Sequence, residues 1–173
     1  GRAKSERLAY LAGMENDDVG KALNTLLDGA ADGLNLSKFA SNRNLRSDEA
    51  GRLFASIPLK SVATKGGLLG FSAPRWSGLR VKVVEALAAW HTRHPDIVGP
   101  SEERVLNGSG IPLCGEATSA IVAELAEEGT IHRCGTLVHL PAHRPRLDPA
   151  DAERWQRIEP LLQEGGLRSL SVT

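Results

Sequence analysis

The densest group of side chains capable of metal chemistry is His132, Cys134, His139 and His143, which occur within twelve residues. Imidazole and thiolate are ligands that Zn²⁺ prefers, and His132 and Cys134 would share one face of a strand. A structural zinc site usually needs a CxxC knuckle or a matched histidine pair, and the sequence contains neither. We therefore expect no bound metal, with Cys134 and the upstream Cys114 as partly buried free thiols. A zinc-supported adaptor is the weakest alternative.

A glycine and lysine pattern near the start superficially resembles a phosphate-binding loop. Six residues separate Gly13 from Gly20 where four are needed, and Ala22 stands where a Mg²⁺-binding Ser or Thr is required. Asp17 and Asp18 would repel phosphate, and helix capping explains them better. The chain also lacks a Gly-x-Ser-x-Gly nucleophile elbow. We therefore predict a non-catalytic chain with no cofactor of its own.

An internal repeat organises the chain, and its clearest mark is a pair of hairpins. Residues 61–71 are expected to form two short strands around a Gly-Gly turn, and residues 130–140 repeat this shape around a Cys-Gly turn. Each hairpin follows a helix and leads through a Pro-Arg connector into a helix with an early tryptophan, Trp76 or Trp155. The period of roughly 70 residues suits tandem small domains.

Helical periodicity and capping residues predict the elements between the hairpins. In the first period Ser47 is the expected N-cap of a helix, which follows shorter helices over residues 5–11, 17–27 and 37–41. In the second period we expect helices over residues 76–94, 101–106 and 116–128. The third period begins with a helix from Pro149, bent at Pro160, whose expected buried stripe is Trp155, Ile158, Leu161 and Leu162.

Helix, turn, helix and hairpin in this order are typical of a winged helix. We therefore predict a mainly α fold with short β-hairpins, of α+β class, built from tandem winged-helix modules. Residues 1–75 form the first module and residues 76–143 the second. Residues 144–173 form a connector and the first helix of a truncated third module. The joints at Pro74 and at residues 143–145 are the expected pivots.

The remaining candidate site residues are cationic. Residues 1–75 carry 11 Lys and Arg against 8 Asp and Glu, residues 76–143 carry 5 against 8, and residues 144–173 carry 5 against 5. In a winged helix the third helix can enter a groove and the hairpin can touch the nucleic-acid backbone. The candidate nucleic-acid contacts are therefore Arg43, Arg46, Arg52 and Lys65, with an ordinary solvated surface as the alternative. The acidic third helix of the second module indicates a protein-facing scaffold instead.

Three stretches near the C-terminus carry a resemblance. They are residues 143–147 (His-Arg-Pro-Arg-Leu), 155–162 (Trp-Gln-Arg-Ile-Glu-Pro-Leu-Leu) and 165–168 (Gly-Gly-Leu-Arg). Together they resemble the junction between the second and third winged helices of bacterial selenocysteine-specific elongation factors, the SelB family. Residues 73–76 and 91–96 are similar to the preceding junction. The family usually has two prolines after Gly-Leu-Arg, where Ser169-Leu170 stands here.

The resemblance implies a translation factor whose N-terminal part, outside this chain, binds GTP, Mg²⁺ and selenocysteinyl-tRNA. The distal winged helices of that family bind an mRNA hairpin, the selenocysteine insertion element. This chain would link the GTPase body to those modules and would meet mRNA, tRNA and ribosome through the full-length protein. No RNA-contact residue of the family carries over onto it.

Two further expectations concern the location of the chain in the cell and an alternative function. The apolar runs are far shorter than the ~20 residues that a membrane span needs, so we expect no membrane partner. Two cysteines without paired spacing suit a reducing cytosol, so we expect a cytoplasmic chain. We also expect the fragment to be monomeric. The alternative function is a winged-helix DNA-binding transcriptional regulator. Tight binding to duplex DNA with a steep salt dependence would favour that alternative.

Overall fold

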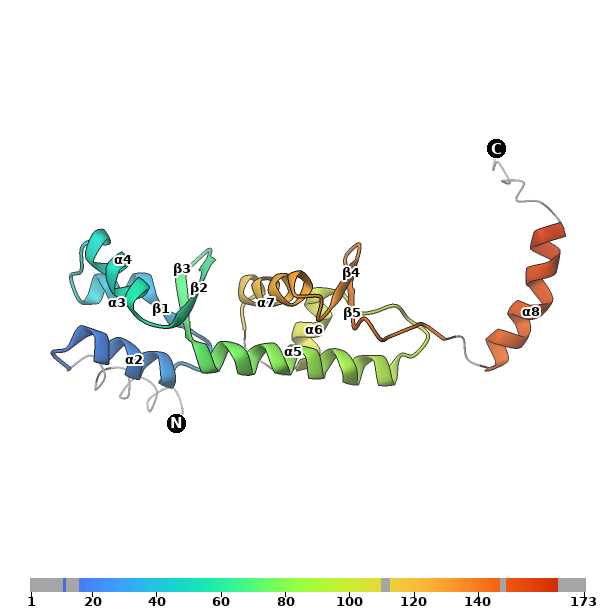
Figure 1. Ribbon diagram of the computed structural model, residues 1–173, viewed down its shortest axis with the longest axis horizontal. Helices are drawn as coiled ribbons and strands as arrows, with labels where there is room; N and C mark the ends of the chain where they lie inside the picture. The colour runs from blue at the N-terminus through green and yellow to red at the C-terminus, as the bar shows by residue number, and fades with distance from the viewer. Residues whose placement is uncertain (1–10, 12–15, 110–112, 147–148, 165–173) are drawn as a thin grey trace.

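The computed structural model describes residue 11 and residues 16–109, 113–146 and 149–164. Its elements are, in order, α2 (Val19–Gly29), β1 (Leu34–Asn35), α3 (Leu36–Asn42), α4 (Ser47–Ser56), β2 (Leu59–Thr64), β3 (Gly67–Ser72), α5 (Ala73–Arg93), α6 (Glu102–Ser109), α7 (Gly115–Glu127), β4 (His132–Cys134), β5 (Leu137–His139) and α8 (Pro149–Glu164). Figure 1 shows an elongated arrangement, with α2 to β3 at one end, α5 to β5 in the middle and α8 at the other end. We call α2 to β3 the first unit and α5 to β5 the second unit.

Side chains at the helix starts explain where the helices of the first unit begin. The Asp18 carboxylate accepts the Gly20 N–H at 3.0 Å, and the Asn35 side chain accepts the Lys38 N–H at 2.8 Å. The prediction that Ser47 caps α4 is wrong by one residue, because Arg46 occupies the N-cap position. The Glu49 carboxylate accepts the Arg46 N–H at 3.0 Å and so satisfies the donor that lies ahead of the first turn. Of the helix predicted over residues 5–11, only Leu11 is described.

The hairpin of the first unit forms as predicted. Strands β2 and β3 pair antiparallel from Leu59 opposite Ser72 to Thr64 opposite Gly67, and β1 pairs with the other edge of β3. Gly67 has φ +111, a conformation that side chains other than glycine rarely adopt, so the turn requires it. The sheet covers an apolar cluster made mainly by α2 and α3, whose fully buried members include Leu23, Leu27, Leu36 and Phe39.

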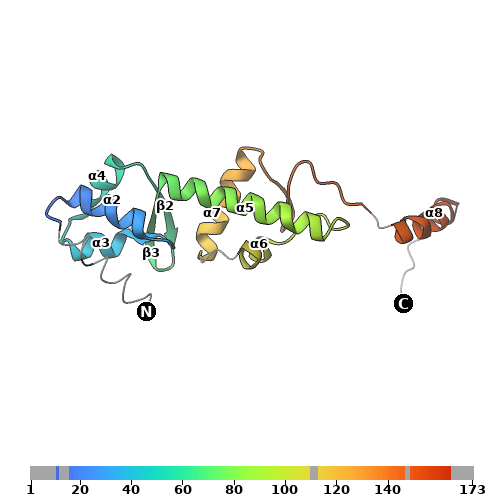
Figure 2. The same ribbon diagram turned by 90° about the horizontal axis from the view of Figure 1, so that it is seen from below.

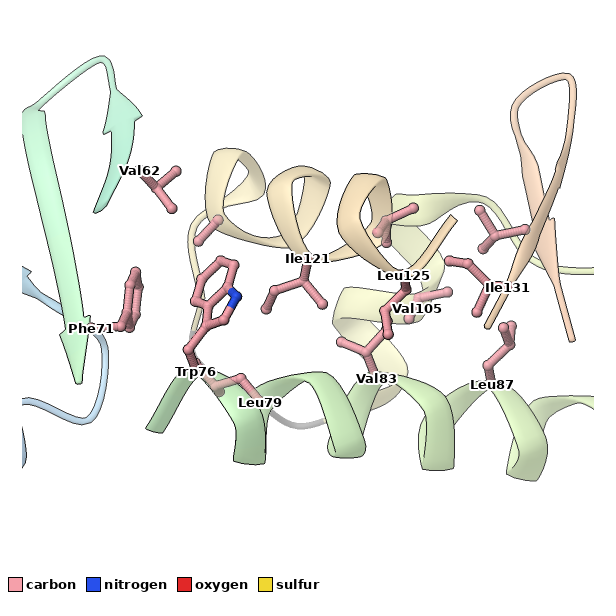
Figure 3. Close-up of a cluster of buried hydrophobic side chains, with 13 residues drawn as sticks. Val62, Phe71, Trp76, Leu79, Val83, Leu87, Val105, Ile121, Leu125 and Ile131 are labelled. Carbon is pink, nitrogen blue, oxygen red and sulfur yellow. The ribbon is translucent and has the colours of Figure 1, made fainter. Parts of the chain in front are cut away.

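The second unit repeats the pattern of three helices followed by a hairpin, which closes with the register His132 opposite His139. One face of the long α5 buries Trp76, Leu79, Val83 and Leu87, the stripe that periodicity predicts. In Figure 3 these side chains point toward α7 and the hairpin, where Ile121, Leu125 and Ile131 meet them.

The two units share this second cluster. Val62 of β2 and Phe71 of β3 belong to it, and the Phe71 and Trp76 rings lie 5.2 Å apart between centroids. Because α5 begins at Ala73, directly after β3 ends at Ser72, the chain passes from one unit to the other without a loop. Pro74 lies in the first turn of α5 and not in a loop, and the expected pivot there stays a prediction. The predicted boundary at residue 75 stays a prediction.

Helix α8 differs from its prediction. Trp155 is 48% exposed and Ile158 is 46% exposed, so the expected buried stripe is wrong for these two residues. Both views show α8 apart from the second unit (Figures 1 and 2). The helix runs through Pro160 to Glu164. The side chains of Leu161 and Leu162 lie outside the described residues.

The observed mixture of helices and small antiparallel sheets agrees with the α+β class. The assignment of the repeated unit to tandem winged helices stays a prediction. None of the described helices combines the length and the apolar character needed to cross a membrane.

Candidate nucleic-acid interface

Two of the predicted contact residues, Arg46 and Arg52, lie at α4 and are paired with its own carboxylates. The Arg46 guanidinium lies 3.0 Å from Glu49, and the Arg52 guanidinium lies 3.0 Å from Asp48. Their side chains are 74% and 73% exposed, so such surface pairs contribute little energy and a phosphate can compete for the guanidinium groups. The hydrogen bonds from Arg46 lower the pKa of Glu49, so this carboxylate stays charged and reduces the local positive potential.

Arg43 is half-buried and makes a tertiary contact. It follows α3, and its Nη2 donates to the Asn16 carbonyl at 2.7 Å. This hydrogen bond ties the turn after α3 to the segment that precedes α2. The geometry therefore gives Arg43 a structural part within the first unit.

Lys65, the fourth predicted residue, lies at the turn between β2 and β3 and faces α7. Its backbone N–H donates to the Glu116 carboxylate at 3.4 Å. The backbone N–H groups of Glu116 itself and of Lys65 lower the pKa of Glu116, and the Lys65 charge adds to this effect. The structure thus directs Lys65 to an acidic helix, and no described contact brings it together with the three arginines.

The contact between the units has a charged centre that we did not predict. The Glu124 carboxylate of α7 accepts the Trp76 Nε1–H at 2.7 Å and pairs with Lys60 of β2. The Lys60 ammonium also lies 5.8 Å from the centroid of the Trp76 ring. Burial opposes ionisation of Glu124, but hydrogen bonds from Lys60 and Trp76, with the charges of Lys60 and Arg80, outweigh it and lower its pKa.

This centre explains the acidic character of α7. Glu116 and Glu124 contact the hairpin of the first unit, and Glu128 pairs with Arg80 of α5. Helix α7 is the third helix of the second unit, which is the position of the groove-entering helix in a winged helix. Its glutamates contact protein instead. The sequence did show several carboxylates on one predicted helix and a lysine on a predicted strand. It could not show that Lys60 and Glu124 form a pair, because 64 residues separate them in the chain.

The histidines gather where the chain leaves the second unit. His91 of α5 is 8% exposed, and its Nε2 accepts the Leu140 N–H at 3.2 Å. The His143 ring stacks on His91 with 3.7 Å between centroids. Burial of His91, reinforced by the charges of His143 and His139, lowers its pKa from 6.5 to about 4.

The hairpin histidines and cysteines do not assemble a metal site among the described residues, where no group of three or more His, Cys, Asp or Glu is suitably arranged. The rings of His132 and His139 meet edge to face at 5.6 Å. Cys114 is a partly buried free thiol as expected, whereas Cys134 is exposed, so its predicted burial is wrong. The reason is that β4 lies at the surface with all three of its residues exposed.

Comparison with known proteins shows that the chain resembles part of a translation elongation factor. No family model matches the sequence. One relative is the selenocysteine-specific elongation factor of Escherichia coli (strain K12), which is 32% identical to this chain over 163 residues, or 93% of this chain. The chain spans 25% of the length of that relative. The resemblance predicted from the sequence is therefore confirmed, and a DNA-binding regulator is not favoured.

Proposed function

We propose that this chain is the C-terminal segment of a selenocysteine-specific elongation factor and acts there as a non-catalytic arm. In the full-length protein the arm joins the GTP-binding body to the modules that bind the mRNA hairpin. GTP, Mg²⁺ and selenocysteinyl-tRNA would be bound outside this chain. The factor would act in the cytoplasm, where the full-length protein binds mRNA and the ribosome. The two units are interpreted as tandem winged helices.

The observation that carries the proposal is the joint between the units. An arm can hold an RNA-binding end at a defined distance only if its modules keep a constant relative orientation. Here β3 runs into α5 without a loop, Val62 and Phe71 enter the core of the second unit, and Glu124 binds Lys60 and Trp76. Burial and hydrogen bonding across one joint favour a rigid pair over two modules on a tether.

A flexible insertion in the full-length factor tests the arm. A Gly-Ser linker between Ser72 and Ala73 interrupts no helix or strand, but it separates β3 from α5 and lets Val62 and Phe71 leave the core of the second unit. We expect selenocysteine insertion at a UGA reporter to fall strongly, while GTP binding by the factor is unchanged. The matched control is the same linker after Gly135, at the exposed tip of the second hairpin, which should leave insertion near the wild-type level. Unchanged insertion with the linker after Ser72 would contradict a rigid arm.

A further inference from the structure

Charge is distributed very unevenly along the second unit and the segment that follows it. Residues 76–131 carry 4 Lys and Arg against 8 Asp and Glu. Residues 132–146 carry 3 Arg and 3 His with no Asp or Glu. Glu116 and Glu124 of α7 contact the first unit, whereas the positive charge of residues 132–146 that is unpaired among the described residues lies at Arg144 and Arg146, because Arg133 pairs with Glu102.

The fold brings this cationic segment to the end of α5. The Arg146 N–H donates to the Pro95 carbonyl at 2.9 Å, and the His143 Nε2 lies 2.9 Å from the Ile97 carbonyl oxygen. Together with the stacking of His143 on His91, these contacts hold residues 140–146 against the last turn of α5 and the loop after it. The segment that carries Arg144 and Arg146 is thereby placed against the loop that follows Arg93, the last residue of α5. We call Arg93, Arg144 and Arg146 the exit surface.

The charges of the exit surface are available for a ligand. All three residues are exposed. The Arg93 Nε donates to the Ala89 carbonyl at 3.2 Å and the Arg144 Nη1 to the Pro141 carbonyl at 3.0 Å. Among the described residues no ion pair involves any of the three. The described arginines that do pair with carboxylates are Arg46, Arg52, Arg80, Arg133 and Arg154.

We propose that the exit surface binds the phosphate backbone of RNA. Guanidinium groups form bidentate hydrogen bonds with phosphate, and several of them without carboxylate partners create a local positive potential that attracts a polyanion. A protein partner fits less well, because protein interfaces have an apolar centre depleted of charge, whereas this surface is made of arginines. The choice of RNA over other polyanions rests on the proposed function in translation.

The test measures RNA binding of this chain by fluorescence anisotropy with a labelled RNA hairpin at several KCl concentrations. The variant Arg144→Ala/Arg146→Ala removes two of the three charges and should weaken binding about tenfold or more at low salt. Because each phosphate contact contributes about 0.7 (single strand) to 0.9 (duplex DNA) to the magnitude of the log–log salt slope, the loss of two contacts should make the slope shallower by about 1.4–1.8. Arg144→Lys/Arg146→Lys keeps the charges and should retain most of the slope.

The matched control is Lys38→Ala/Lys82→Ala, which lowers the net charge by the same amount at exposed positions outside the exit surface and away from the candidate contacts at α4. Stronger loss in the exit variant than in this control supports the proposal. Equal loss in both, loss only in the control, or no measurable binding by the wild-type chain at low salt would overturn it. RNA binding by the exit variant at the wild-type level would also overturn it. In a parallel measurement with anionic lipid vesicles, a loss of vesicle binding alone, with RNA binding unchanged, would overturn it as well. None of these results affects the linker test of the rigid arm, so the two proposals can fail separately.

Discussion

Replacing Glu124 by alanine should destabilise the chain through the joint between its units. The variant removes the acceptor of the Trp76 Nε1–H, whose indole is 6% exposed, and leaves a buried donor without a partner. A buried unsatisfied donor costs about 1–3 kcal/mol. Loss of the half-exposed pair with Lys60 adds about 0–1 kcal/mol. We expect the free energy of unfolding to fall by about 2–3 kcal/mol, measured by urea denaturation.

Two further variants separate these contributions. Glu124→Gln keeps a carbonyl oxygen for the Trp76 N–H and removes only the charge, so it should cost about 1 kcal/mol. Glu127→Ala, an exposed position on the same helix, should change stability by less than about 0.5 kcal/mol. In a double-mutant cycle, Lys60→Ala should couple to Glu124→Ala. Equal costs for Glu124→Ala and Glu127→Ala would refute the reasoning.

Two other predictions concern ionisation and the repeated tryptophans. Because the pKa of His91 is lowered from 6.5 to about 4, folding favours its neutral form. This contribution is complete above pH 6.5 and should be lost as the pH falls toward 4, on the order of 3 kcal/mol in total. Urea midpoints across this range should show that His91→Gln flattens the dependence; an unaltered profile would argue against His91 as its source. Trp76→Ala should cost about 3–5 kcal/mol, whereas Trp155→Ala should cost less than about 1 kcal/mol, because Trp155 is 48% exposed. Similar losses in the two variants, read by far-ultraviolet circular dichroism, would mean that α8 is packed in solution.

Local patterns determined most of the elements. The stripe of Trp76, Leu79, Val83 and Leu87 recurs at helical spacing, and it predicted α5 because that periodicity is a property of one continuous segment. The first hairpin was equally predictable, since only glycine readily adopts the φ of +111 at Gly67. The resemblance to selenocysteine-specific elongation factors also came from contiguous stretches of sequence, and the comparison with the Escherichia coli protein confirms it.

Tertiary structure decided which of these surfaces are free. Trp76 and Trp155 occupy the same place in the repeat, yet only Trp76 is buried, because the following helices return to cover it. Arg46 and Arg52 pair with carboxylates three and four residues away on their own helix, which helical spacing alone indicates, whereas Lys65 meets Glu116 only through the fold. Arg93 and Arg146 were not predicted to share a surface because 53 residues separate them, and the hydrogen bond from the Arg146 N–H to the Pro95 carbonyl brings the two segments together. Charge counts along a chain cannot reveal such neighbours, since ion pairing depends on distances in space.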